Sequence, residues 1–145
     1  EHFGEEILDE KGELNRDRLG EIVFSDCSQL SLLNSIVHPA VKEEILKKIR
    51  QEERRNTNLF IIEAALLIED HYDQICDELW YIYVEEAIRK NRLFYSRGYD
   101  AAKIEDIMRA QLPKDMFLKH CDRVVDNSGV FAETMLQLDN IIKEL

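Results

Sequence analysis

The sequence predicts an α/β fold in which helices connect short parallel strands. Three short apolar runs, at residues 58–67, 78–84 and 122–129, are rich in β-branched and aromatic residues, as is typical of strands buried in a parallel sheet. Stretches with helical spacing separate these runs, which favours parallel pairing with right-handed crossovers. Because ligands bind such sheets beyond the carboxyl ends of the strands, we expect a site at that edge.

Residues 1–55 are predicted to be mostly helical. Asn15 has the residue type of an N-cap, and Pro39 is placed in the first turn of a further helix. The expected elements are the end of a helix at 1–8, a turn at 9–14, and helices at 15–24, 25–37 and 38–55.

Helices are also predicted between and after the apolar runs of the second part of the chain. Gly98 has the residue type that ends a helix in a left-handed conformation. The expected helices cover residues 85–97, 101–112, 114–121 and 129–145.

Composition excludes several classes of function. The net charge is -11, from 30 acidic and 19 basic side chains, which disfavours general binding to nucleic acid or anionic lipid. Cys27, Cys76 and Cys121 lie outside any CxxC pattern, so we expect buried reduced thiols rather than a disulfide framework or a zinc site. No run of some 18 apolar residues and no signal peptide is found, which predicts a soluble cytoplasmic protein.

The beginning of the sequence predicts a fragment. Residue 1 is Glu rather than Met, and "EHFGEEIL" opens inside an amphipathic helical pattern. At 145 residues the chain has the size of one ordinary domain, or of one domain with a lobe.

A basic cluster stands out in this acidic chain, in the segment "IRKNRLFYSRGY" at residues 88–99. On an unbroken helix ending at Gly98, its cations share one broad arc. These cations are Arg89, Lys90, Arg92 and Arg97. A row of guanidinium groups past the carboxyl edge of a sheet suits a polyphosphate, because each planar fork holds phosphate oxygens bidentately. The alternative is a solvated face paired with acids such as Glu85 and Glu86.

Several strings, in this order and spacing, resemble the dephospho-CoA kinase family over nearly the whole chain. They are "LNRDRLGEIVF" at 14–24, "LNSIVHPAV" at 33–41, "IIEAALLIE" at 61–69, "IRKNRLFYSRGY" at 88–99, "IMRAQLP" at 107–113 and "CDRVVDNSG" at 121–129. The resemblance implies a P-loop nucleotide-kinase-like fold, a three-layer parallel sheet with a helical substrate lobe and a helical lid. It places the dephospho-CoA lobe at 1–57 and the rest of the kinase core at 58–145, with the lid at about 86–120.

Two parts of that family are absent from this sequence. The family begins with a strand and a GxxxxGK[ST] phosphate-binding loop, followed by a catalytic aspartate, and residues 1–145 contain no such loop. The resemblance therefore implies an N-terminally truncated chain that is itself inactive.

The resemblance implies roles for individual residues. Arg97 and Arg92 match lid arginines that hold the ATP phosphates and stabilise charge on the transferred group, and Arg89 joins them in binding ATP. Asn127 matches a loop beside the adenine, with turn formation as the alternative role. Gln111 is expected to hydrogen-bond within the lid.

Three further residues are expected to serve the acceptor and the metal. Arg16 matches a helix that faces the pyrophosphate of dephospho-CoA, with a surface arginine as the alternative. His38 matches a histidine near the acceptor, with helix capping or packing as the alternative. Glu63 ends the first predicted strand, where an acid organises Mg²⁺ and its waters, with a solvated strand-end acid as the alternative.

The function implied is transfer of a phosphoryl group from ATP, with Mg²⁺, to the 3′-hydroxyl of dephospho-CoA, the last step of coenzyme A synthesis. The partners implied are ATP and dephospho-CoA, in a monomer or weak homo-oligomer without nucleic acid or membrane. Two alternatives remain open: a kinase of another nucleotide or nucleoside, and a non-catalytic binding module with a kinase fold.

Overall fold

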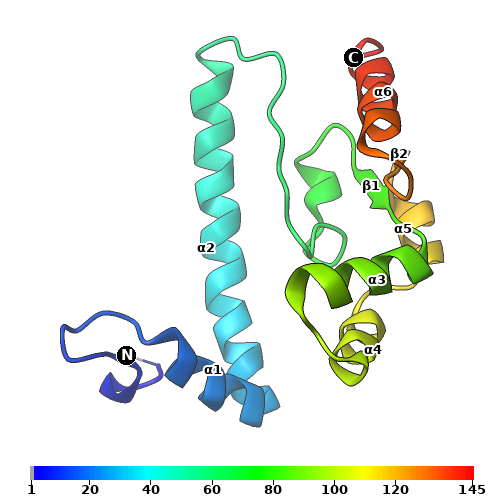
Figure 1. Ribbon diagram of the computed structural model, residues 1–145. Coiled ribbons are helices and arrows are strands. Elements are labelled where there is room, and N and C mark those ends of the chain that lie inside the picture. The colour runs from blue at the N-terminus through cyan, green and yellow to red at the C-terminus, as the bar shows by residue number, and fades with distance from the viewer. Residues whose placement is uncertain (1) are drawn as a thin grey trace. The chain divides into compact units, whose positions relative to one another are not determined.

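The computed structural model describes residues 2–145 (Figure 1). The chain forms two compact units, Glu1–Glu63 and Ala64–Leu145. The predicted boundary lay between residues 57 and 58, whereas in the structure residues 58–63 belong to the first unit. The functions assigned to the two parts stay predictions. Within residues 2–145, no helix is both long enough and apolar enough to cross a membrane.

The first unit begins with a small hairpin rather than with the predicted end of an α-helix. Residues Glu5–Ile7 make one 3-10 turn, and Leu8 then bridges Leu14 in an antiparallel pair. The predicted turn at 9–14 is confirmed: the Asp9 carboxylate accepts the amide N–H groups of the turn, and Gly12 has φ 77°. Because the backbone groups bond across the hairpin, an α-helix cannot form there.

The helix α1, Arg16–Ser25, confirms the prediction for 15–24. The Asn15 side chain caps it by accepting the amide N–H of Arg18 at 3.1 Å. The helix α2, Cys27–Glu53, follows directly and packs on α1, where Val23 is buried. Figure 1 shows α1 beside the beginning of the long helix α2.

Pro39 lies inside α2, so the prediction of two separate helices over 25–55 was wrong. A proline inside a helix removes the hydrogen bond to the carbonyl four residues earlier, here that of Ser35, and its ring crowds the same carbonyl, at a cost of about 3 kcal/mol. The good helix formers after it, in "KEEILKKI" at 42–49, offset that local cost.

The first predicted strand, 58–67, is absent from the structure. The chain is extended around residues 58–64 and turns from residue 65 on, and Ile61 is 74% exposed. A strand needs a neighbour for its backbone N–H and C=O groups, and within residues 2–145 the sheet consists of β1 and β2 alone. The three-layer sheet is therefore reduced to a two-stranded one in a mostly helical structure.

The second unit contains that sheet. Strand β1, Trp80–Tyr83, pairs in parallel with β2, Arg123–Asp126, which confirms two predicted strands and their orientation. The helices also lie close to their predicted ranges and are α3 Glu86–Arg97, α4 Ala101–Ala110, α5 Lys114–His120 and α6 Phe131–Ile142, with a 3-10 turn at Tyr72–Gln74. Gly98 ends α3 in the left-handed conformation, φ 64°, as predicted.

The helix α6 holds the outer edge of β2 through one side chain. The Gln137 Oε1 atom accepts the amide N–H of Asp126 at 2.8 Å, and its Nε2 atom donates to the Asp126 carbonyl at 2.8 Å. The side-chain amide of Gln137 thus pairs with β2 as the backbone of a neighbouring strand would. In this way α6 satisfies the N–H and C=O groups of Asp126, which point away from β1.

The prediction that the cysteines are buried was wrong, because none of the three is fully buried. Cys27 is exposed, while Cys76 and Cys121 are half-buried. Burial raises the pKa of the Cys121 thiol, so this group stays protonated at neutral pH.

Candidate functional site

The carboxyl ends of the two strands meet beside the start of α3. In the register of the sheet Tyr83 is the partner of Asp126. The amide N–H of Asn127 donates to the Tyr83 carbonyl at 2.8 Å, and the amide N–H of Glu85 donates to Ser128 Oγ at 2.8 Å. The loop 126–129 is thereby fastened to the residue that precedes α3.

The same loop is held from the other side by α6. The Thr134 hydroxyl donates to Asn127 Oδ1 at 3.1 Å, which fixes the Asn127 side chain. Ser128 donates its amide N–H to the Asp126 carboxylate at 2.8 Å, and hydrogen bonding by Ser128 lowers the pKa of Asp126. Asn127 therefore sits at the predicted edge of the sheet in an ordered loop.

Arg89 has one satisfied and one unsatisfied donor. Its Nη1 donates to Gln111 Oε1 at 2.8 Å, so the expected hydrogen bond of Gln111 within the lid is confirmed. Its Nε is buried and has no hydrogen-bond partner in the part of the chain that the structure describes. Because a buried charged donor costs free energy when it is left unsatisfied, this atom fits a ligand that brings an acceptor oxygen.

Lys90 differs from the arginines because its charge is already neutralised. Its Nζ lies 2.8 Å from the carboxylate of Glu86 and 2.7 Å from that of Glu105. Hydrogen bonds to Glu105 and Glu86 raise the pKa of Lys90, so it remains protonated. Lys90 thus ties α3 to α4 and matches the alternative of a cation paired with neighbouring acids.

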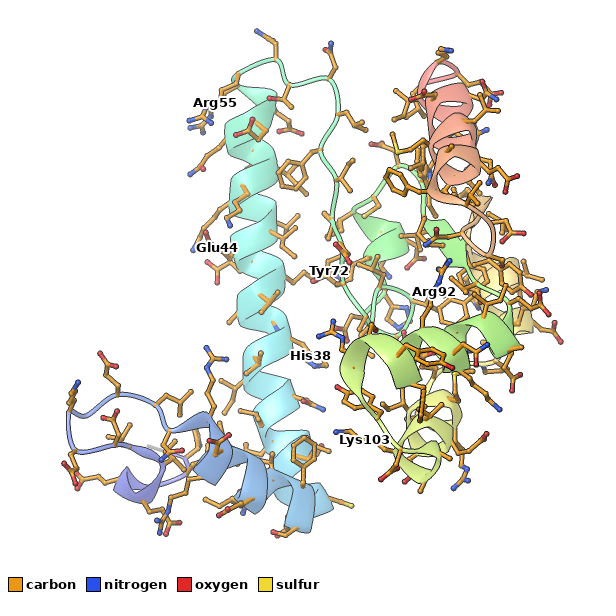
Figure 2. The ribbon with its side chains drawn as sticks, viewed as in Figure 1. His38, Glu44, Arg55, Tyr72, Arg92 and Lys103 are labelled. Atoms are coloured by element: carbon orange, nitrogen blue, oxygen red, sulfur yellow. The ribbon has the colours of Figure 1, made fainter. Side chains whose placement is uncertain are left out.

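Arg92 and Arg97 are exposed on α3. Among residues 2–145 neither guanidinium group makes a hydrogen bond or an ion pair. Figure 2 shows the Arg92 side chain projecting away from the helix backbone. The helix α3 therefore presents one partly buried guanidinium group and two exposed ones, all with donors left over within residues 2–145.

An aromatic platform lies on the face of β1 that carries Tyr81 and Tyr83. The Tyr81 ring stacks on Phe117 of α5, with centroids 4.6 Å apart, and lies edge-on to Tyr83 at 5.9 Å. The Lys114 Nζ atom lies 4.2 Å from the centroid of the Tyr83 ring. Burial raises the pKa of Tyr81, and the positive charges of Arg89 and Lys114 lower it by a smaller amount.

Lys114 was missed by the sequence reasoning. It lies outside the basic segment 88–99, and its approach to Tyr83 depends on how α5 folds back onto β1. The sequence did contain a usable signal. Lys114 and Phe117 are three residues apart, which places both on one side of the predicted helix, and Tyr81 and Tyr83 alternate on one face of the predicted strand.

The remaining predicted residues belong to the first unit. Arg16 is exposed as the first residue of α1, His38 is half-buried in α2, and Glu63 is exposed at the end of the extended segment. Figure 2 labels His38 on α2. Within residues 2–145 no group of three or more His, Cys, Asp or Glu side chains is arranged to hold a metal ion. Any ion at Glu63 would need ligands from elsewhere.

Comparison with known proteins gives a consistent result. The family model described as dephospho-CoA kinase matches residues 1–133. The chain is 36% identical over 142 residues to a dephospho-CoA kinase of Carboxydothermus hydrogenoformans, covering 98% of this chain and 69% of that protein. It is 33% identical over 137 residues to one of Symbiobacterium thermophilum, covering 94% and 57% respectively.

Solved structures share the fold. The crystal structure of TT1252 from Thermus thermophilus matches with a TM-score of 0.73 at 24% identity, covering 92% of this chain and 69% of that one. A dephospho-CoA kinase from Campylobacter jejuni matches with a TM-score of 0.70 at 22% identity, covering 95% and 68%. The chain thus aligns almost completely with proteins longer than itself.

Proposed function

The chain belongs to the dephospho-CoA kinase family, and on that premise we propose that it carries the lid and the acceptor lobe of an enzyme that phosphorylates dephospho-CoA. The reaction transfers the γ-phosphoryl group of ATP to the 3′-hydroxyl of the acceptor's ribose. One observation supports it most: α3, which starts at the carboxyl edge of the sheet, presents guanidinium donors that have no partner among residues 2–145, at Arg89 Nε, Arg92 and Arg97.

In this proposal the lid arginines hold and neutralise phosphate. Arg97 and Arg92 contact the transferred group, where charge spreads over the oxygens as the bond to the leaving group breaks. Arg89, held by Gln111, donates its buried Nε to a phosphate oxygen of ATP. Asn127 borders the adenine in the loop at 126–129.

The first unit serves the acceptor. Arg16 pairs with the pyrophosphate of dephospho-CoA, and His38 lies near its nucleotide. Glu63 would help to hold the Mg²⁺ ion that accompanies ATP, and the ion would supply positive charge to offset that of the phosphates.

Two parts of the machinery are proposed to lie outside residues 1–145. The sequence contains no GxxxxGK[ST] loop, and the chain spans 57% to 72% of the length of the relatives it matches. The phosphate-binding loop and the aspartate that takes the proton of the 3′-hydroxyl belong to the remaining length. The 145-residue chain by itself is then inactive.

The proposal is tested by ATP-dependent formation of coenzyme A in the full-length protein. Arg97→Ala should lower kcat/KM by about 10²-fold or more, because it removes charge stabilisation in the transition state. Arg109→Ala is the matched control, since Arg109 is an exposed lid arginine already 3.6 Å from the Asp106 carboxylate. Equal activity in wild type and Arg97→Ala would contradict the role of the lid, and faster transfer to nucleoside monophosphates would contradict the acceptor.

A further inference from the structure

Lys114 is held over the carboxyl end of β1 by aromatic side chains. Phe117, one turn along α5, stacks on Tyr81 at 4.6 Å, and this contact fixes the side of α5 that faces the strand. Tyr83 lies on the same face of β1 as Tyr81, because alternate residues of a strand share a face. The Lys114 Nζ atom is 4.2 Å from the Tyr83 centroid, within the range of a cation–π contact.

The ammonium group of Lys114 has no acceptor of its own. Within residues 2–145 it makes no hydrogen bond and no ion pair with a carboxylate within 4.0 Å. The charge of Lys114 contributes to the lowered pKa of Asp126, although hydrogen bonding by Ser128 is the main cause. That carboxylate is already engaged by the Ser128 amide.

A second cation lies near the start of α5, on another helix. Arg89 of α3 is held there because its Nη1 donates to Oε1 of Gln111, three residues before Lys114. The Arg89 Nε atom is buried without an acceptor, whereas its Nη1 is used by Gln111. An ammonium group and a guanidinium group with a donor left over, on two neighbouring helices, suit a phosphate group, because its several oxygens can accept hydrogen bonds from both.

We propose that Lys114 is a phosphate-binding residue that, with Arg89, holds one phosphate group of a bound nucleotide at the carboxyl end of β1. The identity of the nucleotide rests on the proposed function, but the binding of phosphate does not. The Tyr83 ring keeps the ammonium group in place and accepts no hydrogen bond of ordinary strength from it, so donors remain for the phosphate oxygens.

The test measures equilibrium binding of sodium triphosphate, ATP, dephospho-CoA and adenosine to the full-length protein by calorimetry. Lys114→Met removes the charge and keeps the stem, and should weaken triphosphate binding about 3- to 10-fold, as expected for one partly exposed ion pair. Adenosine binding should be unchanged, and Lys114→Arg should restore most of the affinity. Lys119→Met is the control, an exposed lysine on α5.

The two nucleotides separate the possible sources of the phosphate. If Lys114→Met weakens only the binding of triphosphate and ATP, the phosphate held by Lys114 belongs to the phosphate donor. If it weakens only the binding of dephospho-CoA, that phosphate belongs to the acceptor. Both results support phosphate binding at Lys114. Unchanged binding of every phosphate ligand in Lys114→Met, or an equal loss in Lys119→Met, would overturn it. So would a wild type that binds no triphosphate.

The inference and the proposed function can fail separately. Phosphoryl transfer that proceeds with unaltered ATP and dephospho-CoA binding in Lys114→Met defeats the inference alone. Triphosphate binding that depends on Lys114, in a protein that never phosphorylates dephospho-CoA, defeats the proposed function alone. Fluorescence of Trp80, on β1 itself, reports whether each variant keeps the fold of this unit.

Discussion

Replacing Gln137 by Leu should destabilise the second unit by exposing the edge of β2. Gln137 makes two 2.8 Å hydrogen bonds with the backbone of Asp126, one as acceptor and one as donor. Leu has a similar size and helix propensity, so α6 itself should persist. The variant therefore removes the contact between helix and strand and little else.

The expected loss follows from these two bonds. A net contribution of about 1 kcal/mol per bond would give about 2 kcal/mol, but Asp126 is exposed and water can replace part of it. We therefore expect the free energy of unfolding to fall by about 1–2 kcal/mol. With a urea dependence of about 2 kcal/mol per M, the midpoint should fall by about 0.5–1 M.

Urea titration followed by tryptophan fluorescence measures this change, because Trp80 is the single tryptophan and lies on β1. Asn140→Leu is the matched control, an exposed amide on the same helix. The reasoning is refuted if Gln137→Leu unfolds at the wild-type midpoint, or if Asn140→Leu shifts the midpoint as far.

Three other predictions concern the cap, the loop and the lid. Asn15→Ala should destabilise α1 by about 1 kcal/mol, seen as faster amide hydrogen exchange in its first turn; unchanged exchange would contradict the capping role. The pKa of Asp126 is lowered in the folded protein, so its stabilising contribution is present above the ordinary value of 3.8 and is lost as pH falls through the folded pKa. Asp126→Asn should therefore reduce the fall in the free energy of unfolding as the pH is lowered, and an unchanged pH dependence would argue against a stabilising role for the Asp126 carboxylate. Gln111→Leu should leave Arg89 Nη1 without its acceptor and weaken ATP binding several-fold, while Gln111→Glu should retain it; equal affinities in all three proteins would exclude a positioning role.

The sequence predicted the elements whose signals are local. The Asn15 cap, the turn at 9–14 and the Gly98 helix end depend on the chemistry of single residues, and all three are confirmed. The parallel pairing of β1 with β2 followed from helices between apolar runs. These features need no knowledge of distant contacts.

The errors arose where tertiary context decides. The apolar segment 58–67 has the composition of a strand, but strand propensity measures the fit to a neighbouring strand, and within the described residues none pairs with it. The error at Pro39 was local instead, because the good helix formers that follow the proline offset its cost and α2 continues through it. Sequence spacing placed Arg89 on the basic face of a predicted helix, whereas Lys114 reaches the platform through the packing of α5 on β1.

The central claim is tested most directly by identifying the product that the full-length protein makes from ATP and dephospho-CoA. Phosphorus NMR of the reaction should show ADP forming together with a new phosphate monoester coupled to the 3′ proton of the acceptor ribose. ATP that stays intact beside folded protein, or a phosphate that appears on a different acceptor or hydroxyl, would contradict the assignment.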